Sequence, residues 1–344
     1  MNIDYTLIII FVFLLFMNRN KPNNRKYASI FLCIIFIIEA GFRDYVHSNN
    51  DTGNYWHWYE NLYNENFSDL ISSFSVIYNN YEDRDPGFAI LAKLLQIIGF
   101  DFRMFLIFVA CIISIPLCRL LYKYVPTVNG LFLSAMIYQA LFANFFNTGM
   151  RQTIAIGLCL WSLIYYERKM PLQHYFFIFL AFTIHSTALL FAPLYLIRKI
   201  DTKKILFGAL LITPLTMLNA STIVAFLGKG TIFESYAINS TDNLGTPAFT
   251  SMIALITIAI AMNYEKIIHY FKDSLFMIQS VAISLMLTPA SWVDSNFLRI
   301  TFYYLIFLLP LYPILIETVS KNNSSMRQFS YIGSLIALLF LMYR

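Results

Sequence analysis

Charged residues are scarce in this sequence. Only 12% of its 344 residues are Asp, Glu, Lys or Arg, whereas 58% are apolar. Soluble globular domains carry about a quarter charged residues, so the composition excludes an ordinary soluble protein. No polar stretch is long enough to form a separate soluble domain. Apolar runs recur almost from end to end, separated by short connections with Lys and Arg, which is typical of a polytopic membrane protein with a single domain over residues 1–344.

Cysteine and histidine are also sparse. The five histidines and the acids are dispersed along the chain, and this distribution does not predict a metal site. The cysteines lie in apolar runs without metal-ligand spacing, which disfavours a disulfide framework and a zinc site. We interpret the thiols as packing residues. They are Cys33, Cys111, Cys118 and Cys159.

Internal repeats, low-complexity tracts and a cleavable leader are missing too. Basic residues follow the first apolar run instead of preceding it, and no small-residue cleavage site is found, so we expect residues 3–17 to form a span with the N-terminus outside. The net charge of +5 does not indicate nucleic-acid binding, because most basic residues flank spans as topology signals.

The apolar runs predict an all-α transmembrane bundle of about 10 to 12 spans. The clearest spans are 3–17, 27–41, 102–122, 128–146, 150–166, 204–221, 247–263, 274–290, 298–316 and 328–343. Cytoplasmic loops carry an excess of Lys and Arg, which places sixteen of the 24 basic residues inside. They are Arg19, Lys21, Arg25, Lys26, Arg119, Lys123, Arg168, Lys169, Arg198, Lys199, Lys203, Lys204, Lys266, Lys272, Lys321 and Arg327.

Two apolar stretches must bend for this topology to hold. Residues 172–197 are flanked by basic residues at both ends, so an even number of passes is favoured. Half of that run rises only about 20 Å, against a hydrocarbon core of about 30 Å, which predicts a hairpin of two short helices with His185 near its outward turn. Residues 86–99 are predicted to form a re-entrant or surface-lying helix. Such backbone is tolerated where it lines protein or a wet cavity, so both bends indicate an outward cavity.

Two outer loops follow from this topology. Residues 42–85 form a loop too long for a simple connection, and its aromatic spacing from Asp51 onward predicts an interfacial helix. Residues 228–246 are rich in Gly, Ser, Thr and Asn and could act as a lid.

Polar residues that are difficult to explain as packing fall at the outer ends of the predicted spans. Ionisable residues at membrane depth cost several kcal/mol unless they are paired or hydrated, which makes them candidates for function. Several arginines at one cavity suit a pyrophosphate, because the guanidinium fork matches its oxygens and never deprotonates. The candidates are Arg43, Asp44, Arg151, Gln152, His185, Ser186, Asp294 and Arg299.

Structural roles remain open for several of these side chains. Arg43 could pair with Asp44 or Asp85, and His185 could be a packing residue. Asp51 could cap the helix that follows it. An interfacial aromatic belt or stacking on sugar faces would each explain the rings Tyr55, Trp56, Trp58 and Tyr59.

In chain order, these residues form a known pattern. It reads R-x7-D-x3-Y-x3-Y at Arg43, Asp51, Tyr55 and Tyr59, D-P-G-F at Asp85 to Phe88, R-Q-x2-A at Arg151 to Ala155, I-H-S at Ile184 to Ser186, and L-R-x3-Y-Y at Leu298 to Tyr304. Over roughly residues 27–316 the chain resembles the EpsG family, integral-membrane proteins of exopolysaccharide and O-antigen gene clusters described as Wzy-like polymerases. The sequence departs from the pattern at Asp85, where a glutamate is more usual, and Asp44 beside Arg43 leaves open which aspartate matters.

The resemblance implies a GT-C-like bundle and a metal-independent glycosyltransferase without a cofactor. Such an enzyme would lie in the bacterial cytoplasmic membrane with its active site outside. It would transfer a growing glycan from undecaprenyl diphosphate to a lipid-linked repeat unit. The implied partners are the undecaprenyl-diphosphate-linked oligosaccharide, the lipid bilayer, a flippase and a chain-length regulator, and no nucleic acid.

A mechanistic hypothesis assigns roles to the residues of this pattern. Asp51 or His185, with Asp44 as a further candidate, would deprotonate the acceptor hydroxyl, and the arginines would stabilise the departing diphosphate. The predicted substrate-binding residues are Arg43, Arg151, Arg299, Gln152, Tyr55, Tyr59 and Asp85. Two other classes remain open: a membrane glycosyltransferase that adds one sugar, and a non-enzymatic flippase or transporter. Polar groups at the outer boundary and the missing repeat disfavour the transporter.

Overall fold

The computed structural model describes residues 23–47, 51–72, 85–228 and 247–342. These residues fold into helices joined by short connections, and none of them is in a strand. The all-α bundle predicted from the apolar runs is therefore confirmed. The predicted first span and most of the loop 228–246 lie outside the described residues.

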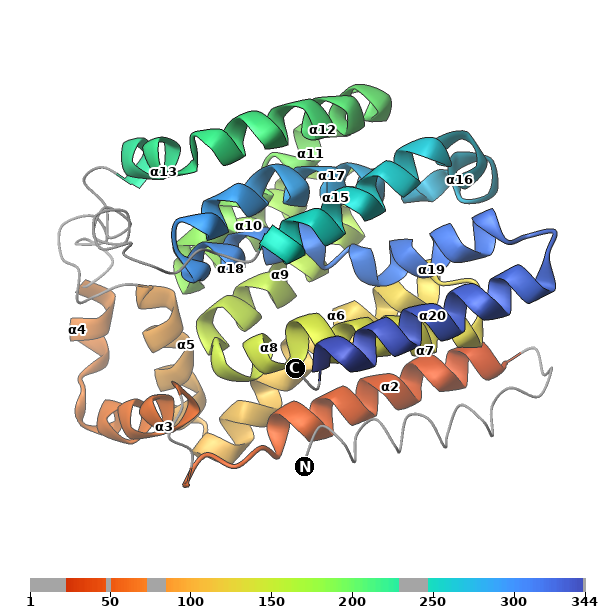
Figure 1. Ribbon diagram of the computed structural model, residues 1–344. Helices are drawn as coiled ribbons and strands as arrows, with labels where there is room; N and C mark the ends of the chain where they lie inside the picture. The colour runs from red at the N-terminus through yellow and green to blue at the C-terminus, as the bar shows by residue number, and fades with distance from the viewer. Residues whose placement is uncertain (1–22, 48–50, 73–84, 229–246, 343–344) are drawn as a thin grey trace. The chain divides into compact units, whose positions relative to one another are not determined.

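The chain divides into two compact units, of which unit 1 comprises residues 1–189 and 331–344. Its helices are drawn in red to yellow-green in Figure 1. They are α2 (Asn24–Gly41), α3 (Asp51–Asn61), α4 (Phe67–Ser72), α5 (Pro86–Ile97), α6 (Phe102–Tyr124), α7 (Val128–Tyr138), α8 (Asn144–Thr148), α9 (Met150–Glu167) and α10 (Pro171–Ile184). Between α7 and α8 the chain makes a π-helical turn, Gln139–Ala143.

Four packed helices form the frame of unit 1: α6 lies against α2 and α9, and α9 packs on α10. The carboxylate of Asp101 caps α6 by accepting from the Met104 backbone N–H at 2.7 Å. At the other end of the frame, Glu167 on α9 pairs with Arg119 at 3.2 Å and Lys123 at 2.8 Å, both on α6. Two of the basic groups predicted to be cytoplasmic thus meet at one end of unit 1.

Helices α3, α4 and α5 gather at the opposite end, where α2 ends and α6 begins (Figure 1). An aromatic core joins them to the frame, with Tyr59 on α3, Phe88 on α5 and Phe105 on α6 all buried. The ring of Tyr59 stacks on Phe105 with centroids 5.0 Å apart. This core also contains Met150 at the start of α9, so the aromatic cluster holds the first turns of α5 and α9 in place.

Unit 2 comprises residues 190–330. Its helices are α11 (Leu194–Ile197), α12 (Thr202–Leu218), α13 (Ala220–Gly228), α15 (Pro247–Met262), α16 (Tyr264–Tyr270), α17 (Leu275–Leu287), α18 (Leu298–Leu305), α19 (Leu308–Val319) and the first part of α20 (Ser324–Met342). Buried Gln279 on α17 donates to the Ile200 carbonyl at 3.1 Å and to the Thr202 hydroxyl at 3.0 Å, which ties α17 to the start of α12.

Three helices of the described residues are long and apolar enough to cross a membrane: 102–124, 128–148 and 272–292. Three further helix pairs pass the same test together but are bent: α12 with α13 by 87°, α15 with α16 by 70°, and α18 with α19 by 54°. The predicted interfacial helix from Asp51 and the predicted short helix 86–99 both form, as α3 and α5. The break predicted near His185 is confirmed, since α10 ends at Ile184.

Candidate functional site

Asp85 opens α5 with an unusual backbone conformation. Its φ of 64° and ψ of 55° are left-handed, a region that aspartate enters more readily than most residues. Pro86 occupies the first helical position, where its fixed φ suits helix initiation. An aspartate in this capping position normally accepts from the N–H groups of its own helix, yet the Asp85 side chain makes no such bond. Its carboxylate is turned away from α5 and is committed elsewhere.

Three groups from other parts of unit 1 hold that carboxylate. Arg151 Nη1 lies 3.5 Å from Asp85 Oδ2, and His185 Nδ1 lies 3.2 Å from the same oxygen. The backbone N–H of Ser186 donates to Asp85 Oδ1 at 3.2 Å. We call Asp85, Arg151, His185 and Ser186 the Asp85 cluster. It joins the start of α5, the first turn of α9 and the break after α10, and so brings together three of the five sequence motifs.

Gly87 allows α5 to come close enough to α10 for these bonds. A Cβ atom at position 87 would lie 2.4 Å from Thr183 Oγ1 and 2.7 Å from the Thr183 carbonyl oxygen. Real Cβ atoms do not approach so closely, and the carbonyl is backbone that cannot swing aside. The glycine of the D-P-G-F motif is therefore explained by helix contact, and it positions the neighbouring Asp85.

Arg151 lies in the first turn of α9, where a positive charge does not stabilise a helix. Its guanidinium carbon lies 5.4 Å from the ring centroid of Phe88 and 5.8 Å from that of Tyr55. Its buried Nε has no hydrogen-bond partner among the described residues. The rings of Phe88 and Tyr55 and the carboxylate of Asp85 thus surround the Arg151 guanidinium, which keeps one unpaired N–H donor among the described residues.

His185 is placed by the end of α10. Its backbone is extended, with φ −157° and ψ 115°, and its N–H closes the helix by donating to the Ala181 carbonyl. This conformation directs the imidazole to the start of α5. The side chains of His185 and Arg151 are 26% and 32% exposed, whereas that of Asp85 is 8% exposed. A solute can therefore reach the histidine and the arginine, with the carboxylate behind them.

Arg43 lies in a second, closed polar region of unit 1. Its Nη1 donates to the Ala40 carbonyl at the end of α2, and its Nε and Nη2 are buried without a partner among the described residues. Burial lowers the pKa of Arg43 to about 10, which leaves it protonated at neutral pH. Arg103 fixes the backbone here, because it donates to the carbonyls of Gly41 at 2.9 Å and Arg43 at 2.8 Å.

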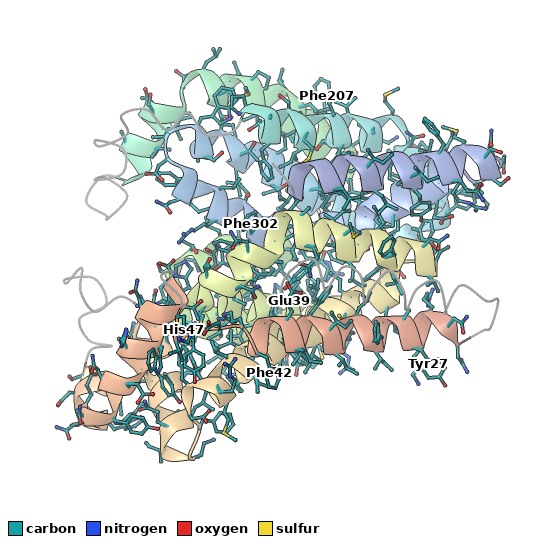
Figure 2. All side chains as sticks on the ribbon, turned by 60° about the horizontal axis from the view of Figure 1, so that its bottom comes forward. Tyr27, Glu39, Phe42, His47, Phe207 and Phe302 are labelled. Atoms are coloured by element: carbon teal, nitrogen blue, oxygen red, sulfur yellow. The ribbon has the colours of Figure 1, made fainter. Side chains whose placement is uncertain are left out.

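Glu39 and Gln139 belong to the same closed region. Gln139, the first residue of the π-helical turn, donates to Glu39 Oε2 at 2.6 Å. Glu39 is only 4% exposed, and Figure 2 shows it on the inner side of α2, away from exposed Tyr27. The charges of Glu39 and Arg43 both act on Tyr138. We call Glu39, Gln139 and Arg43 the sealed group, since four of its polar atoms are buried without a partner among the described residues.

Asp44, Asp51 and Arg299 belong to other elements than those that form the Asp85 cluster. Asp44 is exposed, and its pKa is lowered by hydrogen bonds from the backbone N–H groups of His47 and, at 3.0 Å, Val46. Asp51 is exposed in the first turn of α3, where a carboxylate complements the helix dipole. Arg299 is an exposed residue of α18 in unit 2.

Tyr59 and Gln152 are both buried. The Tyr59 hydroxyl donates to the Phe100 carbonyl at 2.9 Å, and burial raises its pKa, so it stays a neutral donor in the aromatic core. In contrast, Tyr55 is half-buried beside Arg151. Of the predicted aromatic residues, Tyr55 thus contacts the cluster while Tyr59 supports the wall behind it.

Several residues of these two regions are not evident from the sequence. The contributions of the Ser186 backbone and of Thr183 depend on contacts across about a hundred positions. Glu39 and Gln139 lie inside predicted spans, and a buried carboxyl there is a signal that could have been used.

Comparison with known proteins gives one match. No curated protein and no solved structure matches the chain. A sequence model of the EpsG family matches residues 26–344, nearly its whole length. The structure adds that three of the motifs that carry the resemblance, at Asp85, Arg151 and His185, meet around one carboxylate. The chain belongs to the EpsG family.

Proposed function

We propose that this protein is a polysaccharide polymerase that extends a glycan carried on a lipid diphosphate. Membership of the EpsG family supports an exopolysaccharide-related polymerase. The observation that carries the proposal is the Asp85 cluster, in which a carboxylate joins a cation and an imidazole that are open to solutes. Glycosyl transfer from a diphosphate needs this combination, because a proton must leave the acceptor while negative charge develops on the leaving group.

The reaction is a substitution at the anomeric carbon of the lipid-linked donor. The oxygen of an acceptor hydroxyl forms the new glycosidic bond, and its proton passes to a general base. The bond between the anomeric carbon and the diphosphate oxygen breaks, and its electron pair stays on the diphosphate. Asp51 and His185 are the candidate bases, and no metal is needed for this balance of charge.

Arginines are proposed to bind the diphosphate. The Arg151 side chain is 32% exposed, so its guanidinium can donate to phosphate oxygens. Arg43, whose unpaired Nε and Nη2 are buried, is included in the proposal because the sequence pattern predicts it as a substrate-binding residue. Arg299, predicted from the sequence as the third substrate-binding arginine, is included in the proposal on that ground.

The proposed site faces the outside of the bacterial cytoplasmic membrane. The salt bridges of Glu167 with Arg119 and Lys123 lie at the end of α6 and α9 that carries basic residues. The Asp85 cluster involves the first turn of α9, at the opposite end of that helix. Since basic residues favour the cytoplasmic side, this arrangement supports an outward cluster. The proposed substrate is an undecaprenyl-diphosphate-linked oligosaccharide.

A polymerisation assay tests the proposal. Full-length protein in detergent is incubated with the lipid-linked repeat unit extracted from cells that lack this chain. The wild-type protein should yield a ladder of polymers, and Arg151→Ala and Arg299→Ala should leave single repeat units. Arg168→Ala is the matched control, because Arg168 is an exposed arginine at the other end of α9. Addition of one sugar only would identify a single-sugar glycosyltransferase, and no product with the wild-type protein would contradict an enzyme.

A further inference from the structure

We infer that Asp85 is a positioning residue and that His185, through its Nε2 atom, is the general base. This inference rests on the proposed function and decides between the two candidate bases. Its starting point is the N-terminus of α5, where Asp85 takes a left-handed conformation and gives up the bond to its own helix. The left-handed backbone and the lost capping bond make this position unfavourable for Asp85 by itself. We explain it by the contacts of the Asp85 carboxylate with His185, Arg151 and Ser186.

The contact of Asp85 with His185 determines which nitrogen of the neutral imidazole carries the proton. A carboxylate oxygen accepts hydrogen bonds and does not donate them, so Nδ1, 3.2 Å from Asp85 Oδ2, carries the ring proton. In a neutral imidazole the other nitrogen, Nε2, then has the lone pair. None of the described residues hydrogen-bonds Nε2, and the His185 side chain is 26% exposed. The basic nitrogen is thus available to an acceptor hydroxyl.

Two further bonds keep the carboxylate in place while the proton moves. The Ser186 N–H donates to Oδ1 and Arg151 contacts Oδ2. Asp85 and Arg151 together carry no net charge, so proton uptake by His185 makes the cluster positive as the diphosphate becomes more negative. Electrostatic stabilisation of that change would be greatest at the moment of transfer.

Asp51 does not show a comparable arrangement. Its carboxylate is exposed in the first turn of α3, and the stabilisation of the helix N-terminus accounts for its position. The charged groups that face the His185 ring, by contrast, come from two other helices: Asp85 from the start of α5 and Arg151 from α9.

Asp85→Asn separates positioning from structure. Asparagine tolerates the left-handed conformation and keeps a side-chain oxygen for the Ser186 N–H, but its NH2 group replaces the oxygen that accepts from His185 Nδ1. With an N–H group of the amide facing Nδ1, the ring proton moves to Nε2 and the basic nitrogen is lost, so kcat should fall while the KM for the lipid-linked repeat unit stays unchanged. Turnover should fall about 100-fold, since the ring is no longer held in one orientation. Asp101→Asn is the matched control, because Asp101 caps α6 in the same unit and forms no ion pair with any of the described residues.

Chemical rescue provides a second measurement. His185→Ala should lose about 10² to 10⁴-fold in turnover, as expected for a general base. Added imidazole should restore part of that activity, and it should fail to do so in Asp85→Asn/His185→Ala. Both experiments follow polymer formation from the lipid-linked repeat unit extracted from cells that lack this chain.

The outcomes distinguish this inference from the proposed function. An inactive wild-type protein would contradict the polymerase itself. If the wild-type protein is active, an unchanged kcat in Asp85→Asn overturns the inference, as does a loss that appears only in KM. Rescue by imidazole that does not depend on Asp85 overturns it as well, as does a loss in Asp51→Ala larger than that in His185→Ala.

Discussion

Unit 1 contains two polar regions whose hydrogen bonds are satisfied in opposite ways. In the Asp85 cluster both carboxylate oxygens are occupied, and the arginine and histidine around it are partly exposed. In the sealed group, one bond joins Gln139 to Glu39, and four other nitrogen and oxygen atoms are buried without a partner among the described residues. Low-polarity surroundings make an unpaired polar atom costly, so the second arrangement stores unfavourable energy.

This contrast assigns different consequences to changes in the two regions. A substitution in the open cluster should alter turnover and leave folding largely intact, because its arginine and histidine are partly exposed. A substitution in the sealed group should alter stability first. Four variants test this difference, from the largest expected loss of turnover or stability to the smallest.

Gly87→Ala should have the largest effect, because it separates the two helices on which the open cluster depends. The new Cβ would overlap the backbone oxygen of Thr183, so α5 and α10 must move apart and Asp85 must leave His185. Turnover should fall at least about 100-fold, in line with a displacement of about 1 Å at a reacting group. Polymer length and rate are measured on the purified protein. Gly208→Ala is the control, since a Cβ there meets no atom within 4 Å, and equal losses in both variants would refute the contact argument.

Glu39→Ala tests the sealed group. It removes the acceptor of the Gln139 amide and leaves a buried donor without a partner, so the free energy of unfolding should fall by about 2 kcal/mol. Thermal unfolding in detergent measures this loss, and the turnover of the folded fraction should not change. Glu39→Gln keeps the shape and an acceptor oxygen and should lose less. A larger effect on turnover than on stability in Glu39→Ala would show that Glu39 takes part in catalysis. The two polar regions would then not differ in function.

Arg43→Met should raise stability while lowering activity. The pKa of Arg43 is lowered to about 10 because folding buries its charge, so the folded state carries a cost at neutral pH that begins to fall only as the pH rises through about 10. An apolar side chain of similar length removes this cost and should stabilise the protein by about 1 to 2 kcal/mol. Polymerisation should nevertheless decline, since the donors proposed to bind diphosphate are lost. Lower stability together with full activity would show that Arg43 has a structural role.

Ser186→Pro should have the smallest effect, a loss of about 5-fold in turnover, or about 1 kcal/mol. Proline removes the N–H that donates to Asp85 Oδ1, and the extended backbone of His185 suits the residue before a proline. Ser186→Ala keeps that N–H and removes the hydroxyl, so it should retain wild-type turnover. Equal rates in the two variants would show that the backbone bond to Asp85 is dispensable.

Much of the helical framework can be predicted from the sequence. Apolar runs bounded by charge predict α6 and α9 to within about two residues, and flanking basic residues predict the break at His185. The site is predicted less completely. The motifs single out Asp51 and His185 as bases with similar support, because a motif records residue types and their order and contains no information on which side chains meet.

The sequence by itself determined that this chain is an apolar helical protein whose Arg, His and Asp residues follow the pattern of the EpsG family. Only the tertiary structure decided which carboxylate meets the histidine. Asp85 and His185 are 100 positions apart, and Asp85 and Arg151 are 66 apart. Their meeting depends on the close packing of Gly87 against Thr183 and on a left-handed residue at the start of α5. The physical reason is that the position of a span in the sequence depends on local apolar content, whereas the members of a polar cluster depend on which helices pack against each other.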